Sequence, residues 1–276
     1  MRLGVMFDRD LPPERLVPFA QALDSRIDDV WVVEDLGWTG GLSSAAAALA
    51  ATSRVRVGLG IAPAPLRNPM LLAMEFANLA RLFPGRFVGG IGHGVQEWMR
   101  QVGAAAPSPL TLLEETITSV RGLLRGESVT MDGRAVHLDA VRLVHPPAVA
   151  PPVVAGVKGP RSLAMSGRVA QGTILPEGFG PDAIGPALER ISASGEHELI
   201  VFTLLCVGDP SGLERMRAGA AEFLGVGPSE VFAAEGSPAQ AAEAVKALWA
   251  AGVNTVVLRP VGDDPLSHVE QLLSAL

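Results

Sequence analysis

Residues 55–94 read VRVGLGIAPAPLRNPMLLAMEFANLARLFPGRFVGGIGHG and contain a complete strand–helix–strand unit. The apolar runs at 55–61 and 86–91 predict strands buried on both faces, as parallel strands usually are. Between them a helical pattern covers 68–82 and opens with Pro69, a residue favoured in the first turn of a helix. A strand, a helix and a second strand in this order are typical of an α/β fold built on a parallel sheet.

The same alternation continues through all 276 residues. Further strands are predicted at 2–7, 29–34, 152–157, 172–176, 199–207 and 254–260. Helical patterns cover 12–25, 111–126, 159–170, 210–225 and 237–252, and a last helix carries His268. Eight strands with seven or eight helices favour a single (β/α)8 TIM-type barrel, a fold of roughly 250 residues. A doubly wound sheet can also be drawn from the same alternation.

One segment breaks this rhythm. Residues 127–143 form two β-like arms around Asp132 and Gly133, a dipeptide typical of a hairpin turn. We expect a small hairpin excursion between the fourth helix and the fifth strand. No linker or low-complexity tract interrupts the chain, so residues 1–276 are predicted to form one domain.

Composition excludes several classes of protein. The formal net charge is −7, whereas a nucleic-acid surface needs clustered Lys and Arg. Cys206 is the only cysteine and tyrosine is absent, which excludes disulfides, paired-cysteine zinc sites and a phenolic acid or base. No His-x-His or His-Glu-x-x-His spacing occurs, so we expect no metal site.

The chain lacks a signal-peptide core near its start and any long apolar run, so we expect a cytoplasmic protein with no membrane contact. Hydrophobic residues make up 48% of the chain and charged residues only 18%. Such a composition leaves apolar surface to spare, which predicts a homodimer.

In a barrel, the loops after the strands form the active site. The Gly90-x-Gly92 pair fails as a dinucleotide fingerprint, because position 95 is valine and this is not the first strand–helix unit. Gly92 and Gly94 are expected to let the backbone approach a flat or phosphorylated ligand. His93 between them is a candidate for hydrogen bonding or proton transfer, and its alternative role is that of a loop histidine bonded to backbone.

Two other loops carry charge. In GVKGPRS, Gly159 and Pro160 place free N–H groups at a helix start beside Lys158 and Arg161, which suits an anion. The alternative is an ordinary turn with solvated cations. The second loop has Glu34 and Asp35 at the end of a strand, and as neighbours they point to opposite sides, so one at most faces the barrel mouth.

With these residues described, the chain resembles the bacterial-luciferase-like family of flavin- or deazaflavin-dependent oxidoreductases. The resemblance rests on the 55–94 stretch, with its Arg-Asn-Pro and the Gly-Arg-Phe that opens the next strand. It also rests on HPPAVAPPVVAGVKGPRSLAMSGRVAQGTIL at 145–175, whose Gly-Pro-Arg precedes a helix. These motifs occur in the same order in the family, and the similarity covers nearly the whole chain.

The resemblance implies a barrel that holds an isoalloxazine-type ring at the carboxyl ends of its strands. The residues that it assigns to the cofactor are Glu34, Ile61, Ala62, Gly92, His93, Gly94, Gly156, Val157, Lys158, Gly159, Pro160, Arg161, Pro176 and Glu177. Ile61 and Ala62 would back the ring, where the family often has a bulge or a cis peptide, and 156–161 would hold the phosphate.

The chain also departs from the family, which often ends its second strand with Asp-His where this chain has Glu34-Asp35. The role of a catalytic base is then vacant or passes to Asp35 or His93. We expect hydride transfer between coenzyme F420, a deazaflavin, and an unknown small organic substrate. The alternatives are an FMN-dependent monooxygenase, which could need a flavin reductase partner, and a non-catalytic barrel that binds the cofactor.

Overall fold

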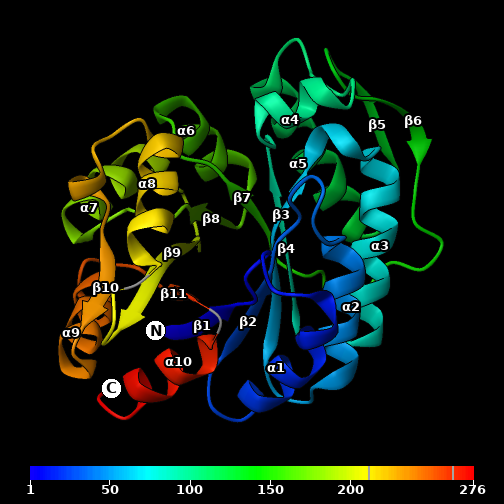
Figure 1. Ribbon diagram of the computed structural model, residues 1–276. Coiled ribbons are helices and arrows are strands. Elements are labelled where there is room, and N and C mark those ends of the chain that lie inside the picture. The colour runs from blue at the N-terminus through cyan, green and yellow to red at the C-terminus, as the bar shows by residue number, and fades with distance from the viewer. Residues whose placement is uncertain (211, 263) are drawn as a thin grey trace.

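The computed structural model describes residues 1–210, 212–262 and 264–276 and shows a closed parallel barrel (Figure 1). Each strand pairs in parallel with the next, and β11 pairs with both β9 and β1, which closes the ring. The (β/α)8 barrel is therefore confirmed and the doubly wound alternative is wrong. The barrel strands are β1 (Arg2–Met6), β2 (Asp29–Val32), β3 (Arg56–Pro63), β4 (Phe87–Gly92), β7 (Val153–Gly156), β8 (Gly172–Leu175), β9 (Glu198–Val207) and β11 (Thr255–Pro260).

Helices cover the outside of the barrel (Figure 1). Proline stands at the first position of α3, α5, α6, α7, α9 and α10, where its missing N–H group costs no hydrogen bond. The helices are α1 (Leu16–Leu23), α2 (Gly41–Ala51), α3 (Pro69–Leu82), α4 (Gln96–Gln101), α5 (Pro109–Leu124), α6 (Pro160–Val169), α7 (Pro181–Ile191), α8 (Leu213–Leu224), α9 (Pro238–Ala250) and α10 (Pro265–Leu273). The expected helix at 210–225 includes Ser211, which lies outside the described residues.

The sequence patterns missed several elements. The helix α2 is almost all alanine and small residues and has no distinct apolar stripe, and α7 contains Pro186 in its interior. The short strand β10 (Ala233–Gly236) pairs with the end of β9, beyond the point where β8 stops. The predicted excursion is present as β5 (Val129–Asp132) and β6 (His137–Val141), an antiparallel hairpin between α5 and β7.

The barrel interior is filled by large apolar side chains rather than left open. Trp31 is fully buried, and its ring lies 5.5 Å from that of Phe202 in an edge-on arrangement. The glycine at position 58 leaves space for this indole, since a Cβ on Gly58 would collide with the ring. The interior of the barrel at the level of Trp31 and Phe202 is therefore a packed apolar core.

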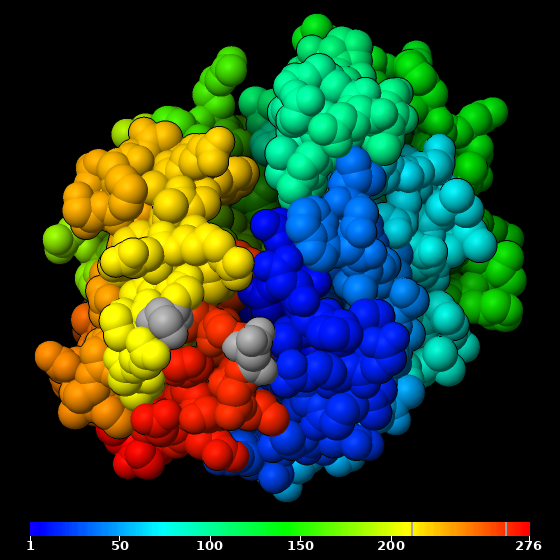
Figure 2. Space-filling model, viewed as in Figure 1, coloured from blue at the N-terminus to red at the C-terminus, as the bar shows by residue number. Residues whose placement is uncertain are grey.

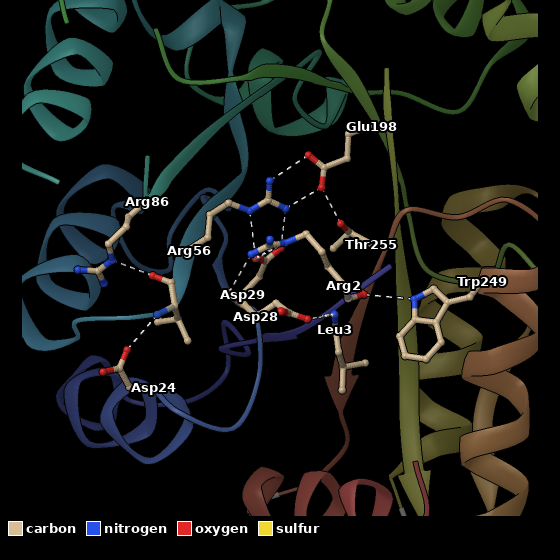
Figure 3. A network of polar contacts seen from close by, with 11 residues as sticks. Arg2, Leu3, Asp24, Asp28, Asp29, Arg56, Arg86, Glu198, Trp249 and Thr255 are labelled. Atoms are coloured by element: carbon tan, nitrogen blue, oxygen red, sulfur yellow. Dashed lines mark hydrogen bonds and ion pairs between the residues drawn. The ribbon is translucent and has the colours of Figure 1, made fainter. Parts of the chain in front are cut away.

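The amino ends of the strands are sealed by a charged network (Figure 3). Arg56 bridges the fully buried carboxylate of Asp29, at 2.7 Å, and Glu198, at 2.6 Å. Arg2 also contacts Asp29 at 2.6 Å, and the Thr255 hydroxyl donates to Glu198 at 2.6 Å. Such buried charges are tolerated because each one is paired, so this end of the barrel serves stability.

The outer face of α3 bears on association. Leu71, Met74 and Leu82 lie exposed there. The homodimer remains a prediction, and this face is its candidate interface.

Among the described residues, none of the helices has the length and apolar character needed to cross a membrane.

Candidate functional site

A bulge in β3 shapes the carboxyl end of the barrel. Leu59 pairs with Gly89 and Ala62 with Ile91, so Gly60 and Ile61 together face a single residue of β4. The peptide bond between Gly60 and Ile61 is cis. The bulge and the cis peptide lie where the family resemblance places them.

The bulge turns the side chain of Ile61 into the barrel. A Cβ on Gly92 would lie 2.8 Å from this side chain, and one on Gly156 would lie 2.6 Å from it. Ile61 itself therefore fills the space above these two glycines. Ala62, by contrast, is buried on the helix side of the strand, as is Val157 after β7. Of the predicted ring-backing pair, only Ile61 faces the interior.

His93 follows β4 directly and is half-buried. Its Nδ1 lies 3.2 Å from the carbonyl oxygen of Pro109. Because a carbonyl only accepts, this contact puts a proton on Nδ1 and leaves Nε2 as the basic nitrogen of the neutral ring. Burial lowers the pKa of His93, and the bond to Pro109 opposes this only in part. The side-chain amide of Gln96 donates to the carbonyls of His93 and Gly94, each at 3.2 Å, and so fixes the loop.

Glu34 and Asp35 point to different partners, as expected for neighbours. Glu34 forms an ion pair with Arg67 and accepts a 2.8 Å hydrogen bond from the backbone N–H of Gly41. It thus ties the end of β2 to the first turn of α2. Asp35 instead pairs with Arg9 at 2.6 Å. Asp35 is therefore the carboxylate tied to the loop that follows β1.

Two tryptophans join this ion pair. The Arg9 guanidinium lies 4.4 Å from the ring centre of Trp38 and 5.9 Å from that of Trp98 in α4. The Trp38 indole N–H donates to Asp10 at 3.0 Å. This cluster connects the loops after β1 and β2 with the segment after β4. Figure 2 shows the surface hollowed between the α4 region (cyan-green) and α8 (yellow).

Sequence reasoning missed a second charged group at the carboxyl ends. Arg259 in β11 donates to Asp8 at 2.6 Å and to the predicted residue Glu177 at 3.1 Å. Burial by itself would lower the pKa of Arg259. The carboxylates of Asp8 and Glu177 together have the larger effect, and they raise the pKa of Arg259. The available signal was a pair of charged residues, Asp8 and Arg259, at the ends of two apolar strands.

The loop after β7 opens α6 as predicted. Gly159 is the residue before the helix and Pro160 is its first residue, so the first-turn N–H groups face outward without helical partners. Lys158 donates to the carbonyl oxygen of Phe223 in α8 and lies 4.3 Å from the centre of its ring. Burial lowers the pKa of Lys158. Arg161 is exposed beside the same turn, and Pro176 and Glu177 follow the adjacent strand β8.

The family model for luciferase-like monooxygenases matches residues 2–211 of this chain. The chain belongs to the luciferase-like monooxygenase family. The matched region covers β1 to β9 and therefore includes every predicted site residue.

Several curated relatives of this luciferase-like protein are named as F420-dependent enzymes. It is 30% identical over 225 residues to an F420-dependent glucose-6-phosphate dehydrogenase from Beutenbergia cavernae, covering 74% of this chain and 66% of that one. It is 26% identical to a 5,10-methylenetetrahydromethanopterin reductase from Methanolobus tindarius, covering 71% and 60%. The chain spans between 43% and 66% of the length of such relatives.

Solved structures show the same fold. The F420-dependent tetrahydromethanopterin reductase from Methanopyrus kandleri superimposes with a TM-score of 0.87 at 18% identity, over 100% of this chain and 98% of that one. An F420-dependent secondary alcohol dehydrogenase with an F420–acetone adduct gives 0.86, and an FMN-bound Baeyer–Villiger monooxygenase from Pseudomonas putida gives 0.76, both at 18% identity. They cover 100% and 99% of this chain and 98% and 96% of theirs.

Proposed function

We propose that this protein transfers hydride between coenzyme F420 and a small organic substrate. The observation that carries the proposal is the set of curated relatives at 29% to 32% identity, which are F420-dependent dehydrogenases. A deazaflavin has a carbon atom where a flavin has N5, so when bound it supplies a hydride donor or acceptor rather than an oxygen activator.

The residues present fit such a group. The first turn of α6 offers free N–H groups for a phosphate, and a Cβ on Gly159 would meet only the Ser162 hydroxyl, at 3.5 Å. Lys158 uses one donor on Phe223 and keeps two for an anion. Ile61 offers an apolar surface inside the mouth for the face of a ring. We assign the phosphate to Gly156, Val157, Lys158, Gly159, Pro160 and Arg161, and the ring to the surroundings of Ile61, Gly92, His93 and Gly94.

Removal of a hydride from an alcohol also releases a proton, which needs an acceptor in the protein. We assign this role to Nε2 of His93, because Nδ1 is turned to Pro109 and the lowered pKa keeps the ring neutral. Asp35 is the second candidate, but its carboxylate is held by Arg9. The remaining predicted residues, Glu34, Ala62, Pro176 and Glu177, act in this proposal by shaping the site.

A second candidate is an FMN-dependent monooxygenase, with a flavin reductase as its partner. The description of the matching family favours it. The two candidates differ in their electron acceptor, because an F420 dehydrogenase works without oxygen whereas a monooxygenase consumes it.

The experiment is an anaerobic assay of the purified protein with oxidised F420 and a panel of primary and secondary alcohols and sugar phosphates. A decrease in the absorbance of oxidised F420 that occurs only when a substrate is present supports the proposal. Oxygen consumption with reduced FMN, and no F420 reduction under any condition, supports the second candidate. Cofactor binding without turnover in either assay supports a carrier protein and contradicts hydride transfer.

A further inference from the structure

A small cavity lies at the opposite end of the barrel from the candidate active site. Its volume is about 100 Å³, and it is bounded by the last turns of α5 and by the segments that lead into β7 and β8. The apolar part of its lining comes from Leu124, Ala150, Pro151 and Val153, and the polar part comes from Arg121, Arg125 and Gln171. No carboxylate lines this cavity among the described residues.

Arg121 has donors that the protein does not use. Its Nη1 donates to the carbonyl oxygen of Val169 at 2.5 Å, at the carboxyl end of α6. Its Nε is buried and has no hydrogen-bond partner among the described residues. Because Nε is shielded from contact with water, a ligand in the cavity would accept from the Nη groups of Arg121.

Arg125 adds a second positive charge one helical turn away. It binds Glu127 through Nε at 2.6 Å and Nη2 at 3.1 Å, which leaves Nη1 free for another acceptor. Like charges four residues apart on a helix repel each other, and an anion between them relieves that repulsion. Because Glu127 already balances the charge of Arg125, the two arginines and this carboxylate together leave one net positive charge beside the cavity.

Gln171 supplies a neutral donor on the facing wall. Its Oε1 accepts from the backbone N–H of Val153 at 3.1 Å, which leaves the NH2 group of the same amide available. The cavity therefore combines two guanidinium groups and one amide with apolar walls, where charged hydrogen bonds are strong.

We propose that this cavity binds a tetrahedral oxyanion, phosphate or sulfate. A volume of about 100 Å³ holds roughly three water molecules. Pockets for organic ligands are usually about 300 Å³ or more, so the space suits a single anion or the phosphoryl end of a larger molecule. The inference does not depend on the proposed function, because the cavity shares no residue with the candidate active site.

The test is calorimetric titration of the purified protein with sodium phosphate and sodium sulfate, against sodium chloride at equal ionic strength. We expect saturable binding of phosphate and sulfate at this cavity. Arg121→Gln should weaken it about tenfold or more, because a charge-assisted hydrogen bond is lost. Arg190→Gln, on the exposed surface of α7, should leave the affinity unchanged. The same titrations are repeated in a Gly159→Asp background, which removes the α6 turn as a second phosphate site, and the loss caused by R121Q should persist in that background.

Arg125→Gln is the second variant, because the hydrogen bonds and ion pair of the Arg125 side chain among the described residues are with exposed Glu127, and their loss is compatible with folding. It should also weaken binding. A phosphate monoester such as glycerol 2-phosphate distinguishes the source of the anion, since tighter binding than phosphate identifies the end of a larger ligand. Equal affinity in the wild type, R121Q and R125Q, or binding that does not saturate, would overturn the proposal.

Discussion

The carbonyl oxygen of Leu59 occupies the space where a side chain on Gly90 would begin. This contact exists because the bulge in β3 brings its backbone against β4. This contact accounts for the glycine at position 90 in the GGIGHG run. The Ile61 side chain accounts for Gly92, because a Cβ there would collide with it. Gly90 and Gly92 are therefore packing requirements of the bulge that shapes the site, and not parts of a dinucleotide fingerprint.

Gly90→Ala should lower the free energy of unfolding by about 3 kcal/mol, because the added methyl overlaps a backbone atom that cannot rotate away. Urea unfolding followed by circular dichroism measures this loss. Gly219→Ala is the matched control, since it lies within α8 with open space around it and should stabilise by up to about 1 kcal/mol. Equal stability of the two variants would show that the contact between Leu59 and Gly90 is absent.

Gly159→Asp should weaken cofactor binding by about tenfold or more while the protein stays folded. The backbone there is extended and unobstructed, and aspartate is a favourable residue before a helix, so stability should be unchanged or slightly higher. The carboxylate, however, would occupy the place proposed for the phosphate. Gly159→Asn gives the same cap without the charge and should bind nearly as well as the wild type. Equal weakening by both would point to geometry rather than to an anion.

If His93 is the base, the turnover rate should decrease as the pH falls below 6.5, which gives the pH–rate profile an acidic limb. Burial lowers its pKa from 6.5, so the ring is neutral at pH 7 and the base is lost only as the pH falls through the lowered pKa. The unfolded chain takes up this proton first, so the contribution of His93 to stability is present above pH 6.5 and falls in the same window. His93→Gln should reduce kcat by about 100-fold and remove the limb. An unchanged limb in the variant would exclude His93 as the base.

Arg56→Met should destabilise the protein by about 3 kcal/mol without changing cofactor affinity. It leaves the fully buried Asp29 with Arg2 as its remaining cation, and it leaves Glu198 with the hydrogen bond from Thr255, at the end of the barrel away from the site. Arg100→Ala is the control, because its pair with Glu97 is exposed and should contribute less than about 0.5 kcal/mol. Chemical unfolding and a binding titration on both variants check this prediction. A change in affinity with R56M would contradict the separation of the two ends.

The sequence was sufficient to predict the eight strands, because each is a short apolar run between turn or helix signals. It also predicted which loops meet at the carboxyl ends, since strand order alone places them there. The pairing of Asp8 with Arg259 was missed because the two residues are 251 positions apart and each resembles an ordinary surface charge. The assignment of Glu34 depended on side-chain direction, and only the contacts with Arg67 and Gly41 define that direction.

The measurement that tests the central claim most directly is a paired titration of the purified protein with F420 and with FMN, followed by fluorescence. The proposal predicts saturable F420 binding at least tenfold tighter than FMN binding, and weaker F420 binding in Gly159→Asp. Tighter binding of FMN, or no binding of F420, would contradict the assignment of this barrel to deazaflavin chemistry.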